Sequence, residues 1–387
     1  MFNLLLALIY VCFISLGLPD SLLGSAWPVL CKDISVPVSY AGIISAIMFI
    51  GTIISSFFSG SISRKIGSGM LTSVSVAMTA VALFGFSISD NFWSLLFWAV
   101  PYGLGAGGVD AVLNNYVALH YKAQHMSWLH CFWGLGASIS PYIMSFALLK
   151  LNSWSRGYLI VAIIQIVLSV IIFFSLPLWK KTESEKEKNE KSLTLKEIFS
   201  IKGAIACFLT FFAYCALEVS SSLWVSTYLV GKWEMSAETA SGYASLFYIG
   251  ITSGRAINGF LAMKLSDRFL IRLGTSVVLF GVGLLFFAGN ATLALCGFAL
   301  IGLGCAPIYP CIIHMTPDVF GRENSGSMIG IQMAFAYTGF LTMPPLFGFL
   351  AEATDVSLLP LYLLLLAGFM LFMHETLVLK TKKGKKT

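Results

Sequence analysis

Long apolar stretches recur from one end of this 387-residue sequence to the other, and no other feature constrains its fold as strongly. A transmembrane helix needs roughly 20 mostly apolar residues, and a helix satisfies its backbone polar groups within one segment, as lipid requires. Twelve stretches meet this requirement: 2–30, 38–62, 69–89, 92–119, 126–149, 155–178, 203–230, 238–262, 270–289, 291–314, 324–350 and 356–378. The sequence therefore predicts an all-α integral membrane protein with twelve transmembrane helices.

The composition supports this class and excludes others. Apolar residues make up 57% of the chain and charged residues 11%, with a mean hydropathy of +0.85, whereas soluble domains are about 25% charged. The eight cysteines are scattered without metal-ligand spacing, which is typical of small buried side chains. We expect no enzyme, no cofactor and no nucleic-acid partner. The first apolar run is too long for a cleaved signal and is interpreted as the first span.

One long polar segment, WKKTESEKEKNEKSLTLKE, divides the spans into six and six. Its mixed charges predict a solvated linker that ends in a short surface helix near Leu195. The predicted organisation is a six-helix bundle over residues 1–179, a linker over 180–201, a second six-helix bundle over 202–380 and a basic tail over 381–387.

Positive charge marks one side of the membrane. The loops of the basic side carry Arg64, Lys65, Lys122, the linker lysines, Lys264, Arg268, Arg272, Arg322 and the tail lysines. The opposite loops carry Lys32, Lys150, Arg156 and Lys232. Because Lys and Arg accumulate in cytoplasmic loops, we expect a multi-pass protein of the plasma or inner cell membrane with both termini cytoplasmic.

The two halves of the chain repeat each other. The segments 50–67 (IGTIISSFFSGSISRKIG) and 249–266 (IGITSGRAINGFLAMKLS) align at a constant offset, with Lys65 opposite Lys264. Two six-span halves in parallel repeat, joined by a charged linker, resemble the major facilitator superfamily. That layout implies two pseudo-symmetric bundles around a central cavity that opens alternately to each side.

The first span holds an acidic residue near its middle, Asp20, in GLPDSLLGSAWP. A carboxylate at bilayer depth costs at least ~2.5–3.5 kcal/mol, so it normally faces a water-filled cavity or a partner. Pro19 and Pro28 are expected to loosen the helix beside it, which is tolerated where the backbone lines a cavity.

A second acidic residue, Asp110, lies in the fourth span in GLGAGGVDAVLNNYV. Asn114 follows at i+4 and shares its face, and Asn115 and Tyr116 come next. A carboxylate, two amides and a phenol behind a glycine-rich stretch predict a binding surface. Hydrogen bonding between neighbouring helices is the alternative for the same residues.

The motifs PDSLLGSAWP and GGVDAVLNNY resemble the L-fucose:proton symporter family. That family carries an acid in span one and, in span four, an acid four residues before an Asn, with an aromatic residue two positions later. The resemblance implies proton coupling and sugar binding for Asp20 and Asp110. Two departures could change substrate choice: Asn115 stands where the family has Pro, and Asp110 replaces a longer Glu. Span five, SWLHCFWGLGASISP, resembles the sodium-dependent glucose transporter-like branch, which leaves sodium open as the coupling cation.

Four further ionisable residues lie within predicted spans. His130 could donate to a sugar hydroxyl or serve only in packing. Glu218 occupies the approximate repeat position of Asp20 and is expected to line the cavity. Arg255 could contact substrate, snorkel to the membrane surface or pair structurally with a carboxylate, and His314 is expected at the interface.

Aromatic rings and amides would complete a sugar site, because rings pack against the C–H face of a sugar while amides bind its hydroxyls. Each aromatic residue could instead face lipid or belong to an interfacial belt. The aromatic and amide candidates are Trp27, Tyr102, Tyr116, Trp133, Trp224, Tyr228, Gln165 and Gln332. The predicted substrate-binding set is Asn114, Asn115, Trp27, Tyr116, His130, Trp133, Glu218, Trp224 and Gln332.

We therefore expect a secondary transporter that imports a small molecule, a sugar or related polyol, with a proton or possibly a sodium ion. A proton-driven exporter of drugs or metabolites is the alternative on the same fold. A membrane sensor is disfavoured because no segment outside the spans is long enough to fold alone, and the lack of a nucleotide-binding loop disfavours an ATP-driven pump. Since one chain has both halves, it could act as a monomer in the lipid bilayer.

Overall fold

The computed structural model describes residues 4–121, 123–179, 195–321 and 324–381. Across these ranges all regular secondary structure is helical, so the all-α prediction is confirmed. Most of the predicted linker and nearly all of the basic tail lie outside the described residues, as do Lys122 and Arg322. The short surface helix expected near Leu195 is present as α8 (Leu195–Ser200).

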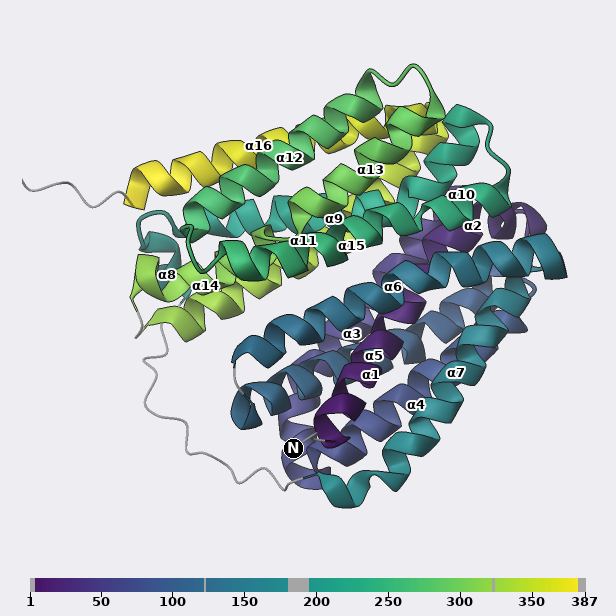
Figure 1. Cartoon of the computed structure of the whole chain (residues 1–387), viewed down its shortest axis with the longest axis horizontal. Helices are drawn as coiled ribbons and strands as arrows, with labels where there is room; N and C mark the ends of the chain where they lie inside the picture. Colours follow the sequence, from purple (N-terminus) through teal and green to yellow (C-terminus); the bar gives the residue numbers. More distant parts are fainter. Residues whose placement is uncertain (1–3, 122, 180–194, 322–323, 382–387) are drawn as a thin grey trace, which may run out of the picture.

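The helices form two groups that lie side by side (Figure 1). The first group consists of α1 (Leu4–Asp20), α2 (Leu22–Asp33), α3 (Tyr40–Ile66), α4 (Ser68–Ser87), α5 (Phe92–His120), α6 (Ala123–Leu151), α7 (Trp154–Phe174) and the 3-10 turn η1 (Leu176–Leu178). After α8, the second group consists of α9 (Ala204–Trp233), α10 (Ala237–Tyr243), α11 (Ser245–Leu261), α12 (Asp267–Phe286), α13 (Ala291–Cys305), α14 (Ile308–Phe320), α15 (Ser325–Ala353), the 3-10 turn η3 (Val356–Leu358) and α16 (Leu359–Thr381).

Eleven helical stretches among the described residues are long and apolar enough to cross a membrane. Eleven of the twelve predicted spans correspond to these stretches, and the first and tenth predicted spans are each built from two consecutive helices, α1 with α2 and α13 with α14. The eighth predicted span falls on α10 and α11, which have 7 and 17 residues and meet at Ala244. Neither helix reaches the length of a span alone, although the two together cover the predicted segment.

Helix starts follow from side-chain caps in the short loops. Asn91 accepts a hydrogen bond from the Ser94 N–H at 2.9 Å, and Asn290 accepts one from the Leu293 N–H at 3.0 Å. An Asn at this position satisfies one of the backbone donors that a helix start leaves unpaired. These caps set where α5 and α13 begin.

Glycines let the first helix approach its neighbour closely. A Cβ at Gly17 of α1 would lie 2.0 Å from the Trp133 carbonyl of α6, and one at Gly136 of α6 would lie 2.0 Å from the Ile14 carbonyl of α1. Only residues without a Cβ fit such a crossing, the usual device of helix packing in membranes. The crossing places Asp20 beside Trp133.

The two groups touch mainly toward one end of the bundle. We call the end where α1 begins and α16 finishes the terminal end, and the opposite end the distal end (Figure 1). Toward the distal end, Ser241 of α10 donates to the Pro141 carbonyl of α6 at 3.3 Å, and Ser39 donates to Glu352 of α15. Closer to mid-height, Phe49 of α3 stacks on Phe340 of α15 with ring centroids 5.0 Å apart.

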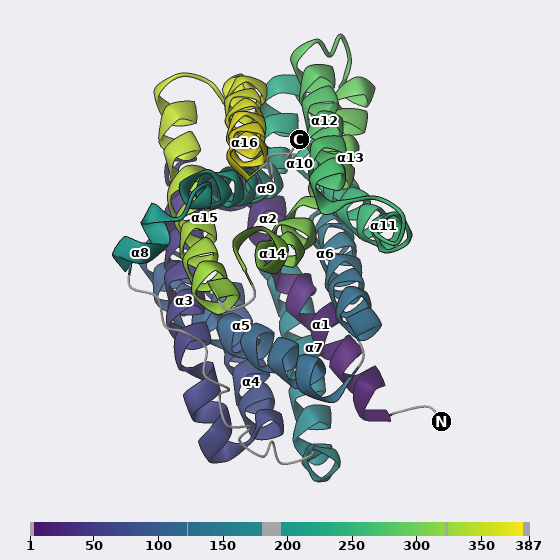
Figure 2. The same ribbon diagram turned by 90° about the vertical axis from the view of Figure 1, so that its left-hand side faces the viewer.

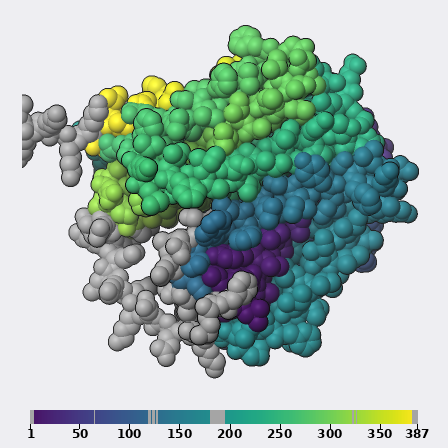
Figure 3. All heavy atoms as spheres, viewed as in Figure 1, coloured from purple at the N-terminus to yellow at the C-terminus, as the bar shows by residue number. Residues whose placement is uncertain are grey.

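The same packing is visible at the surface. Atoms of α10 and α11 lie directly against atoms of α6 in the space-filling view (Figure 3). α6 therefore packs against both of these helices of the second group.

Candidate functional site

Asp20 is the last residue of α1 and lies at the break between α1 and α2. Its chain neighbours Pro19 and Ser21 are buried, yet Asp20 itself is exposed, so its carboxylate opens onto solvent-accessible space inside the bundle. Tyr102 of α5 donates to one carboxylate oxygen at 2.9 Å, and the Trp133 indole of α6 donates to the other at 2.7 Å. Hydrogen bonds to both oxygens favour the ionised carboxylate.

Trp133 joins this carboxylate to the second group of helices. The Arg255 guanidinium of α11 lies over the Trp133 ring, 4.8 Å from its centroid, a cation–π arrangement. Arg255 also pairs with Glu218 of α9 at 3.9 Å and donates to the His130 carbonyl of α6 at 3.2 Å. A charged network thus runs from Asp20 in one half to Glu218 in the other.

Tyr248 of α11 completes the contact between the halves. Its ring lies edge-on to Trp133, with centroids 6.5 Å apart. Our sequence reasoning did not identify this residue. The internal repeat holds the signal that could have found it, because the constant offset places Tyr248 opposite Phe49, which also lies at a contact between the halves.

The second acidic residue forms a separate pair on α5. Asp110 accepts a hydrogen bond from the Asn114 amide at 2.9 Å, as the i+4 spacing predicts. Both residues are half-buried, the Asn114 carbonyl oxygen has no hydrogen-bond partner, and Asn115 is exposed. The pair therefore leaves one buried acceptor, the side-chain oxygen of Asn114, without a hydrogen bond.

Two prolines each leave a backbone carbonyl without its helical donor. Side chains donate to these carbonyls instead and support the break beside Asp20. Pro19 has no N–H to donate to the Ser15 carbonyl, and the Gln165 amide of α7 donates to that carbonyl instead. Pro141 of α6 likewise leaves the Ala137 carbonyl without its helical donor, and the Ser21 hydroxyl donates to it at 2.9 Å. The break is therefore held from two neighbouring helices.

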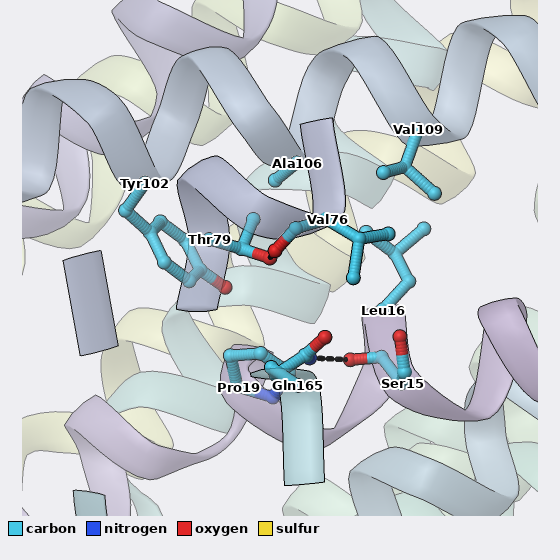
Figure 4. Close-up of a pocket in the computed structure, with 9 residues that line it drawn as sticks. All are labelled: Ser15, Leu16, Pro19, Val76, Thr79, Tyr102, Ala106, Val109 and Gln165. Carbon is cyan, nitrogen blue, oxygen red and sulfur yellow. Dashed lines mark hydrogen bonds between the residues drawn. The ribbon is translucent and has the colours of Figure 1, made fainter. Parts of the chain in front are cut away.

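A small cavity lies behind this break, between α1, α4, α5 and α7 (Figure 4). Its volume of about 10 Å³ is enough for about one water molecule. Tyr102, Thr79 and Gln165 line it, and the Gln165 carbonyl oxygen is buried with no hydrogen-bond partner. Tyr102 thus has Asp20 on one side and this cavity on the other.

Four predicted binding residues lie away from this cluster because they are buried among structural partners. The Trp27 indole donates to the Val38 carbonyl at 2.8 Å, and the Trp224 indole donates to the Pro344 carbonyl at 3.1 Å. Gln332 is fully buried and donates to Thr316 at 2.8 Å. Tyr116 is 1% exposed and packs on Trp179 with ring centroids 5.0 Å apart. None of these side chains offers a surface to a solute in this conformation.

The remaining candidates either pack inside the bundle or lie at its surface. The His130 ring packs edge-on against Phe13 at 5.9 Å, so its backbone carbonyl makes the contact to Arg255 and its ring serves in packing. His314 is exposed and bonds to Asp267 at 2.8 Å, and its position at the membrane interface stays a prediction. Tyr228 is buried against Phe298.

The described residues contain no group of three or more His, Cys, Asp or Glu side chains arranged to hold a metal ion.

Comparisons with known proteins agree with this architecture. A family model described as Major Facilitator Superfamily matches residues 9–299 and, in a second match, residues 207–387. The chain is 23% identical to the glucose/mannose transporter GlcP of Bacillus subtilis, with 81% of this chain and 80% of the relative covered. It is 26% identical to the hexuronate transporter of the same organism, with 87% and 85% covered.

Solved structures share the fold. A crystal structure of the nucleoside transporter NupG superposes with a TM-score of 0.81 at 12% identity, covering 97% of this chain and 99% of that one. A bacterial homologue of the human lysosomal transporter Spinster, in an inward-facing conformation, superposes with a TM-score of 0.76 at 11% identity, covering 98% of each chain.

Proposed function

Since the chain belongs to the Major Facilitator Superfamily and is a secondary transporter, we propose that it imports a sugar or related polyol together with a proton. The observation that carries this proposal is the Asp20 carboxylate, which is accessible inside the bundle and held by donors from Tyr102 and Trp133. The relatives named as glucose/mannose and hexuronate transporters favour a sugar-like solute.

The charge distribution supports an orientation for the cycle. Described basic side chains such as Lys65, Lys264 and Lys380 gather at the terminal end, which we place in the cytoplasm. The packed distal end would then face outward, and the conformation would be the one that follows solute entry. In this inward-open conformation Asp20 accepts two hydrogen bonds, which favour its ionised form. An ionised Asp20 is what we expect after the proton has been released to the cytoplasm.

We assign the two acidic residues related roles. Protonation of Asp20 from outside would remove its charge and permit inward turnover, whereas the donors of Tyr102 and Trp133 would stabilise the charge again on the cytoplasmic side. Asp110, with Asn114 beside it, would bind solute hydroxyls and take part in coupling. The proton is favoured over sodium because both Asp20 oxygens already accept hydrogen bonds from side chains.

The test is to replace Asp20 and to separate coupling from binding. In cells given a panel of radiolabelled sugars and sugar acids, we expect Asp20→Asn to abolish accumulation and sugar-dependent alkalinisation of the medium. Solute counterflow, which needs no net proton movement, should persist in part. Asp90→Asn, which changes an exposed loop carboxylate, is the matched control.

Three outcomes would count against the proposal. Undiminished proton uptake with substrate in Asp20→Asn would remove the coupling role. Uptake that depends on sodium and leaves the pH of the medium unchanged would replace the proton with sodium. Proton-driven loss of a preloaded solute would indicate export.

A further inference from the structure

A second hollow lies at the terminal end of the second group of helices, remote from Asp20. Its volume is about 520 Å³, and it is bounded by the start of α9, the start of α12, and the ends of α14 and α16. Figure 2 looks onto this end and shows these four elements close together. The lining residues are Ile201, Lys202, Arg268, Asp318, Val319, Phe320, Lys380 and Thr381.

Cationic groups outnumber anionic groups in this hollow. Lys202, Arg268 and Lys380 are positively charged, against one carboxylate, that of Asp318. Arg268 is oriented by a hydrogen bond to Thr381 at 3.1 Å, whereas Lys202 and Lys380 are exposed. Within the described residues the hollow therefore carries a net charge of +2.

The backbone adds to the positive potential. The hollow borders Gly203, which precedes the 30-residue helix α9, and a helix start presents unpaired N–H groups and a partial positive charge. Gly203 has a φ of +91°, and a Cβ there would lie 2.9 Å from the Thr381 side chain. This close approach brings the start of α9 to the end of α16, and thereby Lys202 to Lys380.

The position favours a lipid headgroup over a free ion. Each of the four bounding helices belongs to a stretch that is long and apolar enough to cross a membrane, so we place the ends of these helices at the depth of the headgroups. Leu379, next to Lys380, is 68% exposed, and Ile201, Val319 and Phe320 supply an apolar wall. The sequence continues after Thr381 with KKGKKT, which contains four more lysines. Basic pockets and juxtamembrane lysines at this depth attract acidic phospholipids.

We propose that this hollow binds the phosphate headgroup of an acidic phospholipid from the leaflet that faces the terminal end. The acyl chains would run along the apolar surface beside Leu379, and the phosphate would lie among Lys202, Arg268 and Lys380. The proposal concerns a site distinct from the transport network and does not depend on which solute is carried.

The test compares two charge-matched double variants of the full-length protein. Lys202→Gln/Lys380→Gln removes two cations from the hollow, and Lys65→Gln/Lys264→Gln removes two exposed cations outside its lining. Binding of phosphatidylglycerol and phosphatidylcholine is counted by native mass spectrometry, and thermal stabilisation by each lipid and by inorganic phosphate is measured in detergent. We expect the hollow variant to lose phosphatidylglycerol affinity by roughly 30-fold, equivalent to ~2 kcal/mol, while the control variant keeps it.

Each other outcome overturns the proposal. Equal losses in both variants would indicate general attraction to an anionic surface. Equal binding of the two lipids would remove the requirement for an acidic headgroup. Stabilisation by inorganic phosphate as large as that by phosphatidylglycerol would identify a free-anion site instead. A Lys202→Arg/Lys380→Arg variant, which preserves charge, should bind as the wild type does and controls for folding.

Discussion

At the scale of single residues, Trp133 connects the two halves because one side chain makes two different contacts. Its N–H donates to Asp20, and its ring face carries the Arg255 guanidinium. Arg255 also faces Glu218, and their side chains are only 16% and 12% exposed, so neither charge is well hydrated. The pair therefore matters more to the network than an exposed ion pair would.

This pairing predicts the outcome of a double-mutant cycle on Arg255 and Glu218. Arg255→Gln leaves a poorly hydrated carboxylate unpaired and should lower unfolding stability by about 2–4 kcal/mol. Glu218→Gln leaves the guanidinium of Arg255 without its carboxylate and should also lower unfolding stability. The loss should be smaller because the Trp133 ring still covers the guanidinium. Joining the two substitutions should recover at least ~1 kcal/mol of the summed loss, as measured by unfolding in detergent. Strict additivity would mean that the pair, at 3.9 Å, is not coupled.

At the scale of helices, prolines determine how α1 is held around Asp20. Each proline removes one backbone donor, and a side chain of a neighbouring helix replaces it: Gln165 for Pro19, and Ser21 for Pro141. Pro28, in contrast, lies within α2 without interrupting it. The break in the span falls at Ser21, two residues after Pro19, and no break falls at Pro28.

A rescue experiment tests this substitution of donors. Gln165→Leu removes the donor to the buried Ser15 carbonyl and should lower stability by about 1–3 kcal/mol. Adding Pro19→Ala supplies a backbone N–H four residues after Ser15 and should restore most of the loss. Ser169→Ala is the control on the same helix. It removes a hydroxyl that donates to the Ser73 carbonyl, and this carbonyl keeps a backbone donor within α4. The stability of the wild type and of the three variants is measured by thermal unfolding. Failure of Pro19→Ala to restore the stability lost in Gln165→Leu would contradict the explanation.

At the scale of the whole molecule, the halves are joined toward the distal end by contacts that alternating access would have to break. Gly242 of α10 faces Ser145 of α6, and a Cβ at Gly242 would lie 3.5 Å from the Ser145 Cβ. This separation is within the range that a disulfide spans. A bond there would hold the distal end shut.

We therefore expect Ser145→Cys/Gly242→Cys to cross-link on oxidation and to lose solute uptake, with recovery after reduction. The single variants Ser145→Cys and Gly242→Cys, treated with the same oxidant, should retain uptake. Peptide mapping establishes the cross-link, and uptake of the sugar identified in the panel measures the effect. Full uptake by a cross-linked protein would show that the distal contacts do not open during transport.

The class of the protein and its candidate acidic residues could be predicted from the sequence because both depend on local physical chemistry. A run of about 20 apolar residues needs a helix in lipid wherever it occurs, and Asp20 is costly at bilayer depth whatever surrounds it. The Asp110–Asn114 hydrogen bond follows equally from helical spacing alone. The closer kinship to the L-fucose:proton symporters stays a prediction.

Only the tertiary structure decided which aromatic and polar residues surround Asp20. Trp27, Trp133 and Trp224 are chemically equivalent in the sequence, but two of them donate to backbone carbonyls in the packed interior and only Trp133 reaches the carboxylate. Arg255 meets Glu218 and Trp133 across helices that are far apart in the chain. The physical reason is that a span's pattern fixes its own faces, whereas its partners depend on how closely glycines such as Gly17 let neighbouring helices approach and on how the two halves are turned toward each other.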